Sequence, residues 1–325
     1  MLNEKEISVL LPVYDESLAY IKDAFYSVAD QSDESCEIII IDDNPQRSEL
    51  KKFLKDIQAK NPNVVLIFNT VNEGLVYSLN EGLSKARGKY IARMDADDIS
   101  LPTRFKSQVA ILKEGYDFTA ASAIEIDEKS NRIGHRAMPF EGVATNPQVF
   151  RFGNFVIHPS VMMRRDVVDR VGGYHEIPSA EDFDLWVRIL FLLPGSRVFF
   201  KTEPEVLYRV RMNGISIGNR LTMDTSSKAI RKILKHASSL EEYTVLIDKL
   251  ISESKKNSGI RSCKIFKKYY NYGAQKYEVK SRRAKLNPGI KSYAALFASL
   301  ILFPLTWSYI FDAVFRRFRK GGGLS

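Results

Sequence analysis

Three aspartates stand within four positions at the end of an apolar segment, and their spacing is the first sign of chemistry in this sequence. Residues 89–94 are predicted to form a short strand, and Asp95, Asp97 and Asp98 follow it directly. Because side chains alternate along a strand, Asp95 and Asp97 are expected to leave on the same side if the extended conformation continues. Two such carboxylates repel each other, and a hard cation such as Mg²⁺ or Mn²⁺ relieves the repulsion. Such a cation in turn suits a diphosphate.

The same aspartates have a purely structural interpretation. Asp97 or Asp98 would cap a helix whose first turn holds Pro102. The position directly after a strand favours the cation site, because ligands of alternating α/β sheets bind at the carboxyl ends of the strands. The helix cap stays open as the alternative.

Three earlier segments, each at the end of a predicted strand, carry groups that suit a nucleotide. They hold Pro12, Tyr14 and Glu16, then Asp43, then Asn72 and Gly74. A ring such as Tyr14 can stack on a base, and a carboxylate such as Asp43 can accept a hydrogen bond from a ring N–H. Turns favour Asp, Asn and Gly in any case, so a structural role stays open for each. The first strand is followed by no glycine-rich fingerprint and no Walker loop, so the phosphate charge is expected to meet a metal.

A second acidic pair, Glu181 and Asp182, stands at the start of a helix predicted over residues 180–193. The helix dipole tends to stabilise the Asp182 carboxylate, whereas burial beside Glu181 and Trp186 would raise the pKa of Asp182. An ordinary acidic residue of a first helical turn is the alternative.

Three further residues of the second half are candidates for substrate contact, on the acceptor and diphosphate side together with Glu181 and Trp186. His158 is expected mainly to fix the end of a strand predicted over residues 156–163. Arg209 and Arg211 stand two positions apart and could reach a diphosphate; a solvated strand edge is their alternative.

Alternating strands and helices predict how these groups are positioned. Strands are predicted over residues 7–11, 37–41, 64–68 and 89–94, and helices over 17–30, 47–60, 75–87 and from 102. In the second helix, Leu50, Phe53, Leu54 and Ile57 are spaced for one apolar face. Four strand–helix pairs in succession predict an α/β fold with a doubly wound, mostly parallel sheet.

The period changes after residue 115. Strands are predicted over residues 118–126, 197–201 and 205–210, with a hairpin over 124–136. This second half is expected to be mixed α+β and to lie against the first sheet. From residue 222 to about 290 the pattern is helical, basic and rich in tyrosine.

Charge is distributed unevenly along the 325 residues. Residues 251–325 hold 16 Lys and Arg against 3 Asp and Glu, a balance of +13, so the first 250 residues carry −4 of the total of +9. The main body is therefore not a general nucleic-acid binder. Two distant cysteines make no disulfide framework and favour a reducing compartment. The N-terminal sequence lacks the layout of a signal peptide, so no export is expected.

An uncharged segment over residues 292–311 lies between two basic clusters. About 20 apolar residues suffice to span a membrane. Pro304 interrupts the segment, and Lys and Arg flank both sides, which favours a hairpin-like or in-plane segment with both flanks on the cytoplasmic face. A core helix is the alternative.

Several segments, in this order, resemble the family 2 glycosyltransferases of the GT-A fold. They are SVLLPVYDES, IIIIDDNP, NEGLVYSLNEGLSKARGKYIARMDADDISLPTRF, HPSVMMRRD, GGYHEIPSAEDFDLWVRIL and LYRVRMNGIS. The resemblance extends from about residue 6 to residue 216, two-thirds of the chain. It implies a GT-A, Rossmann-like sheet and inverting transfer of a sugar from a nucleotide-diphosphate donor with Mn²⁺ or Mg²⁺.

By this resemblance, particular residues take particular roles. Tyr14 and Asp43 would face the base, Asp95 the ribose and metal, and Asp97 would be the main metal ligand. Asp182 would be the catalytic base, because inverting transfer needs a base on the acceptor hydroxyl and no nucleophile.

The chain departs from the family pattern at the donor rim. Asp15 stands where Asn is usual, and Asn44-Pro45 replaces a Gly-Ser pair, which leaves the donor identity open. No Gln-x-x-Arg-Trp motif follows, so similarity to processive polysaccharide synthases is poor.

The resemblance gives each region an expected role. Residues 1–115 would bind the nucleotide sugar, 116–220 would form the acceptor-binding and catalytic half of the same domain, 221–290 a basic helical region and 291–325 a membrane-associated segment. We expect a hexosyl- or N-acetylhexosaminyltransferase that takes a UDP-sugar to a glycan acceptor linked to polyprenyl diphosphate, on the cytoplasmic face of the inner membrane. The alternatives are a nucleotidyltransferase that makes the activated sugar and a non-catalytic membrane scaffold that binds it.

Overall fold

The computed structural model describes residues 5–32, 35–192, 195–211 and 220–256. The chain divides into two units, Met1–Lys267 and Lys268–Ser325, and all described residues belong to the first. The uncharged segment predicted over residues 292–311 lies outside the described residues, as does the predicted boundary near residue 290. Within the described ranges, every helix is too short or too polar to cross a membrane.

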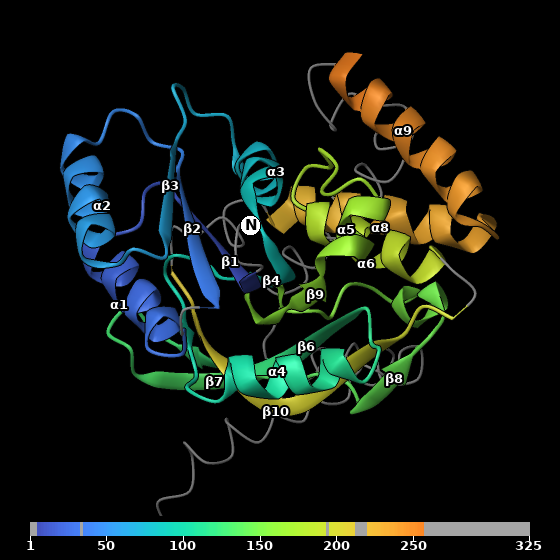
Figure 1. The fold of residues 1–325 in the computed structure, drawn as a ribbon. Helices are drawn as coiled ribbons and strands as arrows, with labels where there is room; N and C mark the ends of the chain where they lie inside the picture. The colour runs from blue at the N-terminus through green and yellow to red at the C-terminus, as the bar shows by residue number, and fades with distance from the viewer. Residues whose placement is uncertain (1–4, 33–34, 193–194, 212–219, 257–325) are drawn as a thin grey trace, which may run out of the picture. The chain divides into compact units, whose positions relative to one another are not determined.

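The first half of the chain alternates strands and helices, as predicted (Figure 1). The strands are β1 Lys5–Val13, β2 Cys36–Asp42, β3 Val64–Phe68 and β4 Gly88–Arg93; the helices are α1 Leu18–Ala29, α2 Ser48–Lys60, α3 Leu75–Lys85 and α4 Arg104–Lys113. The four strands pair in parallel in the order β3-β2-β1-β4. The chain therefore winds in one direction from β1 to β3 and then crosses to the other side of β1, which confirms the doubly wound prediction.

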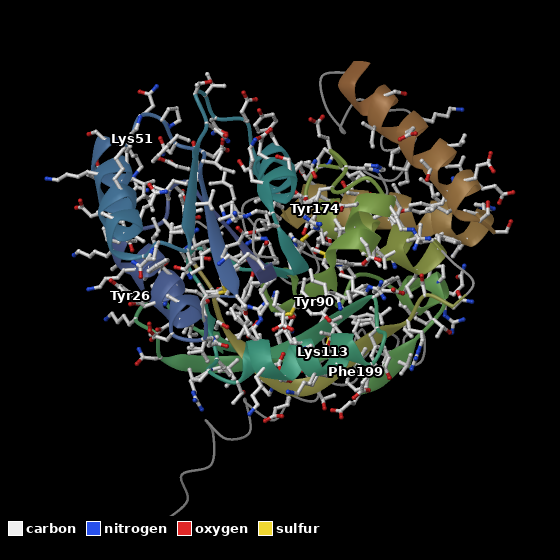
Figure 2. All side chains as sticks on the ribbon, viewed as in Figure 1. Tyr26, Lys51, Tyr90, Lys113, Tyr174 and Phe199 are labelled. Atoms are coloured by element: carbon white, nitrogen blue, oxygen red, sulfur yellow. The ribbon has the colours of Figure 1, made fainter. Side chains whose placement is uncertain are left out.

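Alternate residues of the central strands face two different layers of helices. Val9 and Leu11 of β1 pack in a cluster with α1, α2 and α4, whereas Leu10 packs in a cluster with α3, α5 and α6. Both faces are covered, which explains why the strands are continuously apolar. On the face that α4 covers, Tyr90 is buried and Phe199 packs against the same cluster (Figure 2).

The remaining strands join the same sheet in mostly antiparallel pairs, apart from the parallel pair of β6 and β10. The strands are β5 Ile99–Ser100, β6 Phe118–Ile126, β7 Arg132–Arg136, β8 Gly142–Ala144, β9 Met162–Arg164 and β10 Val198–Arg209; the α-helices are α5 Arg165–Arg170, α6 Glu181–Phe191, α8 Arg220–His236 and α9 Leu240–Lys256; the 3-10 turns are η1 Pro147–Phe150 and η2 His158–Ser160. The sheet continues from β4 in the order β9-β6-β10-β5. The predicted mixed α+β half is thus confirmed.

Three predicted elements, two in this half and one at the end of the first, were wrong in detail. Residues 156–163 form a 3-10 turn around Pro159 and only then the short β9, because proline offers no N–H to a strand ladder. The strands predicted over 197–201 and 205–210 are one strand, β10, whose register shifts at Pro204. The helix expected from Pro102 begins at Arg104, because Ile99–Ser100 first pairs with β10.

Candidate active site

The residues predicted to bind a nucleotide and a cation lie at one edge of the parallel strands. Tyr14 and Glu16 follow β1, Asp43 follows β2, and Asp95 and Asp97 follow β4. The winding direction changes between β1 and β4, so this edge contains the position where ligands bind in open α/β sheets.

The acidic group after β4 is held in a turn. The Asp98 N–H donates to the Asp95 carbonyl at 3.3 Å, so the extended conformation does not continue past the strand. The expectation that strand alternation places Asp95 and Asp97 together was therefore wrong in its reason. The turn brings one carboxylate oxygen each from Asp95, Asp97 and Asp98 within 4.8 Å of one another. Asp98, predicted at most to cap a helix, thus joins the cluster, and the helix cap was wrong.

Burial and mutual repulsion make these carboxylates suitable ligands for a cation. Burial, and then the charge of Asp95, raise the pKa of Asp97 to about 6. Asp98 is buried, and the same two causes raise its pKa well above the ordinary value. Its Oδ1 accepts from the Arg209 N–H at 2.7 Å, whereas its buried Oδ2 has no hydrogen-bond partner within the described part of the chain. Three hard oxygen donors, one of them unpaired, fit Mg²⁺ or Mn²⁺.

Two buried arginines fix the backbone of this turn. Arg93, the last residue of β4, donates to the Met94 carbonyl and to the Asp95 carboxylate. Arg209 donates to the Asp97 carbonyl at 2.7 Å and to the Asp127 carbonyl at 3.0 Å. Arg209 is 3% exposed, so neither the predicted diphosphate contact nor the solvated edge describes it. The sequence signal for Arg93 was a lone cation at the end of an apolar strand.

Arg211 joins the end of β1 to the acidic turn. Its guanidinium lies 3.7 Å from Asp15, 3.6 Å from Glu16 and 2.6 Å from Asp97 in ion pairs. Burial raises the pKa of Glu16, and the Arg211 charge opposes that rise. Arg211 therefore neutralises Asp97, one of the carboxylates that a cation would bind.

The nucleotide end of the site is organised around Asp43. Its Oδ1 accepts from Asn69 Nδ2 at 2.7 Å and from the Glu73 N–H at 2.8 Å, and its Oδ2 accepts from the Gly74 N–H at 2.8 Å. Gly74 has a φ of +88° at the start of α3, a conformation that favours glycine. Asn69 was not predicted, although it directly follows the residues of β3.

The other predicted residues at this end are more accessible. Tyr14 is 41% exposed, and its N–H donates to Glu16 Oε2 at 2.8 Å. Asn72 is exposed in the turn before α3, and Pro12 lies within β1, where it pairs with Ile41. An exposed ring beside a fixed carboxylate is suited to stacking on a base.

The acidic pair at the start of α6 is also as predicted in position. Burial raises the pKa of Asp182 to about 6, although hydrogen bonds from the Phe183 N–H at 2.6 Å and Asn154 Nδ2 at 2.9 Å oppose the rise. Burial and then the charge of Asp182 raise the pKa of Glu181 to about 8. The rise is larger for Glu181, so Asp182 is the member that loses its proton more readily and is the better candidate to accept one from a substrate. The charge of Asp95 also raises the Asp182 pKa, which couples the two acidic groups.

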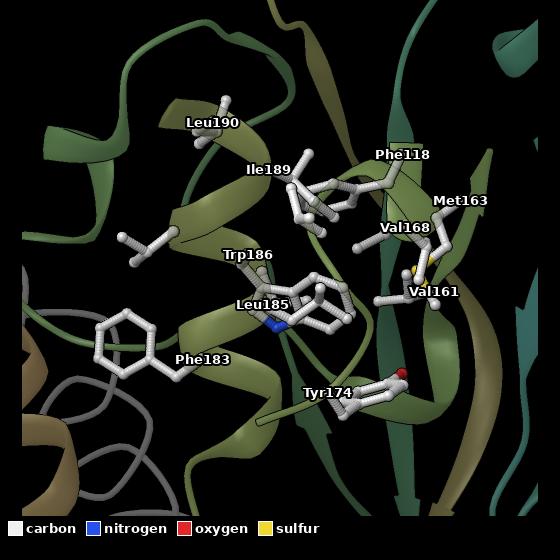
Figure 3. Packing of buried hydrophobic residues seen from close by; sticks show 14 of the residues in the cluster. Phe118, Val161, Met163, Val168, Tyr174, Phe183, Leu185, Trp186, Ile189 and Leu190 are labelled. Atoms are coloured by element: carbon white, nitrogen blue, oxygen red, sulfur yellow. The ribbon is translucent and has the colours of Figure 1, made fainter. Parts of the chain in front are cut away.

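Trp186 and His158 lie behind the acidic pair. Trp186 is fully buried and lies near Phe118 in the core (Figure 3). Its ring centroid is 5.0 Å from that of Phe118 and 5.8 Å from that of His158. It packs in the core and does not line the site, which corrects the expected acceptor contact. His158 Nε2 lies 2.9 Å from the Tyr174 hydroxyl, and burial lowers the His158 pKa well below its ordinary value. His158 is therefore a neutral ring held in a hydrogen bond.

A family model and several known proteins match this chain. The family model described as glycosyl transferase family 2 matches residues 8–172. An uncharacterized glycosyltransferase of Methanocaldococcus jannaschii is 28% identical over 57% of this chain, and the match spans 64% of that protein's length. An O-antigen biosynthesis glycosyltransferase of Escherichia coli, WbnJ, is 29% identical over 70% of this chain and 89% of its own length.

A solved structure supports the fold. The crystal structure of S. aureus TarS, residues 1–349, aligns with a TM-score of 0.53 at 16% sequence identity. The alignment covers 78% of this chain and 73% of that one. The shared architecture agrees with the GT-A-like, mostly parallel sheet described above.

Proposed function

The chain belongs to glycosyl transferase family 2, and from that premise we propose that it transfers a hexose or N-acetylhexosamine from a UDP-sugar to a hydroxyl of a glycan acceptor, with inversion. The observation that carries the proposal is the pairing of two acidic groups. Asp95, Asp97 and Asp98 cluster at the carboxyl end of β4, where they could hold a cation, and Asp182 is a partly buried carboxylate at the start of α6 on which the Asp95 charge acts. The cluster after β4 suits the binding of a diphosphate through a cation, and Asp182 suits proton transfer.

Different residues of the chain bind the different parts of the donor. Tyr14 stacks on the base, and Asp43 accepts from it with a lone pair of Oδ2 that the Gly74 N–H leaves free. Asp95, Asp97 and Asp98 would hold Mg²⁺ or Mn²⁺. When bound, such a cation supplies positive charge that stabilises the departing diphosphate.

Asp182 acts on the acceptor. Its ionised carboxylate takes the proton of the acceptor hydroxyl while that oxygen forms a bond to the anomeric carbon. The bond between that carbon and the diphosphate oxygen breaks, and its electron pair leaves with the nucleoside diphosphate. A pKa of about 6 suits this role, because the group is mostly ionised at neutral pH yet more basic than an ordinary aspartate.

The acceptor is proposed to be lipid-linked and the product a surface polysaccharide. The name of the Escherichia coli relative supports polysaccharide assembly. The basic balance of +13 over residues 251–325 and the uncharged segment 292–311 support a place at the cytoplasmic face of a membrane. A polyprenyl diphosphate acceptor would be held at that surface.

A panel of radiolabelled nucleotide sugars, each with Mn²⁺ or with EDTA, tests the proposal. We expect one donor to be turned over by the full-length protein with membrane-extracted acceptor, and EDTA to stop turnover. Proton NMR of the product should show the opposite anomeric configuration to the donor. Retention of configuration, or release of pyrophosphate from a nucleoside triphosphate and a sugar phosphate, would overturn the proposal.

A further inference from the structure

Asn154 makes a two-sided contact with the proposed base. It lies in the segment between η1 and η2, and its Nδ2 donates to Asp182 Oδ2 at 2.9 Å. Its Oδ1 accepts from the Val156 N–H at 3.0 Å. These partners set the orientation of the amide, because a flipped amide would place oxygen against a carboxylate and NH₂ against an N–H.

Helix α8 holds the segments on both sides of this contact. Arg231 Nη1 donates to the Phe152 carbonyl at 3.0 Å, and Gln148 Nε2 donates to the Leu234 carbonyl at 2.9 Å. Ser226 Oγ donates to the Pro178 carbonyl, just before α6, at 2.7 Å. Asn154 is therefore presented to Asp182 from a segment that is tied to α8.

We propose that Asn154 is a positioning residue that holds the Asp182 carboxylate in the orientation needed to meet the acceptor hydroxyl. The inference rests on the proposed function. The Phe183 N–H holds Oδ1 at 2.6 Å and Asn154 holds Oδ2, so the plane of the carboxylate is fixed from both sides. Each oxygen keeps a lone pair for the incoming proton. Holding a reacting group in place in this way removes the need to orient it during the reaction.

Asn154 also matters for the charge state of the base. Within the described part of the chain, Asp95, Glu181 and the Tyr174 hydroxyl interact electrostatically with Asp182, and none of them donates a hydrogen bond to its carboxylate. Asn154 is the side-chain donor, and the other donors are the backbone N–H groups of Phe183 and of Asp182 itself. Removing the amide leaves only the backbone donors against the same repulsion, so the ionised form of Asp182 loses stability.

The experiment compares Asn154→Ala and Asn154→Asp with a matched control, Asn146→Ala. Asn154→Asp keeps the oxygen that accepts from Val156 and replaces only the donor that faces Asp182. Asn146 is an exposed asparagine whose side chain accepts from the Gln148 N–H at 2.8 Å, away from the base. For each full-length variant, kcat and kcat/KM for transfer are measured between pH 5 and pH 9, with donor Kd from calorimetry and Tm from circular dichroism.

We expect Asn154→Ala to lower kcat about 10- to 100-fold with donor Kd unchanged. The pH at which its rate falls on the acidic side of the profile should rise by about one unit, because the lost hydrogen bond had stabilised the ionised Asp182. Asn154→Asp should move the acidic side of the profile to still higher pH, since it adds a negative charge beside Asp182. Asn146→Ala should keep the wild-type profile.

A wild-type pH profile and kcat for Asn154→Asp would overturn the inference, with the proposed function left standing as long as wild type transfers sugar. A general loss of structure would instead lower Tm and weaken donor binding without moving the acidic side of the profile, and that result would also count against a positioning role. Absence of transfer by wild type with every donor would remove the proposed function, and the inference with it.

Discussion

The carboxylates after β4 are acidic groups that the folded chain holds at a cost. Burial raises the pKa values of Asp97 and Asp98, so ionising them in the folded state is less favourable than in the unfolded chain. This free-energy penalty is absent at pH values below the pKa values of the unfolded chain, and it grows as the pH rises through the pKa values of the folded state. A bound cation removes the penalty. Metal binding should therefore strengthen between pH 5 and pH 8, as the protons leave.

Asp97→Ala is expected to abolish metal-dependent donor binding, because it removes one of three clustered oxygens. Calorimetric titration of uridine diphosphate in the presence of Mn²⁺ measures the effect against wild type. Asp169→Ala serves as the control, since the Asp169 side chain is 60% exposed on α5. Equal affinities for wild type and Asp97→Ala would rule out the metal role.

Asp182→Asn is expected to keep donor binding and to lose transfer by about 10²–10⁴-fold, because an amide is nearly isosteric but cannot take the proton. In wild type, kcat/KM should fall as the pH drops through about 6, where the base becomes protonated. The alkaline side should show no loss from this group, which stays ionised there. If the mutant transfers sugar at the wild-type rate, Glu181 becomes the next candidate for the base.

At the scale of elements, the sequence was most informative where the apolar pattern is regular over a whole element. The strand β3 was predicted at the residues where it lies, and α2 within one residue, because a continuous apolar segment and a regular apolar face each have one good solution. The strand predicted over residues 156–163 was wrong, because a short apolar stretch that contains Pro159 can form a strand or a turn. Tertiary contacts decide between the two. Asp98 and Asn154 could not be foreseen, since the turn and the pairing of distant segments create their roles.

Gly88 offers a test of the packing at the start of β4. A Cβ atom added there would lie 2.4 Å from the Ser8 backbone N and 2.6 Å from the Ile7 carbonyl carbon of β1. Because the backbone of a central strand cannot move away cheaply, Gly88→Ala should lower the free energy of unfolding by about 2 kcal/mol or more. Urea denaturation measures this, with Lys89→Ala at the exposed neighbouring position as the control. Similar midpoints for the two variants would contradict the close contact.

At the scale of the whole molecule, the helical region after the sheet contributes to the core beneath the base. Tyr243 of α9 is fully buried, and its hydroxyl donates to Asp184 Oδ1 at 3.1 Å. Asp184 lies two residues after the base, on the same helix, and also accepts from Arg188 Nε at 2.7 Å. A truncation that spares the site must therefore come after α9.

Truncation at residue 280 is expected to leave the donor and metal sites intact, since their residues precede residue 212. It should release the protein from membranes, because it removes two arginine clusters and the segment 292–311, and each basic residue near an anionic surface contributes about 1 kcal/mol. Activity on a lipid-linked acceptor should fall more than donor hydrolysis. A second truncation before residue 240, which removes Tyr243, should lower Tm as well.

Fractionation of cells that express the full-length protein measures the attachment. Full-length protein that stays in the soluble fraction at low salt, without detergent, would contradict it. Retention through a high-salt wash would indicate insertion of the apolar segment, because salt screens charge attraction and leaves apolar burial intact.

Arg211 gives the cation site a thermodynamic property of its own. Its guanidinium already pairs with Asp97, Glu16 and Asp15, so a divalent ion that binds Asp97 competes with an internal positive charge. A ligand that offers Arg211 new negative charge, as the diphosphate of a donor does, would lessen that competition. Ion and donor would then favour each other's binding, and the coupling free energy must be the same whichever binds first. Measured affinity for the ion alone would accordingly understate its affinity in the presence of donor.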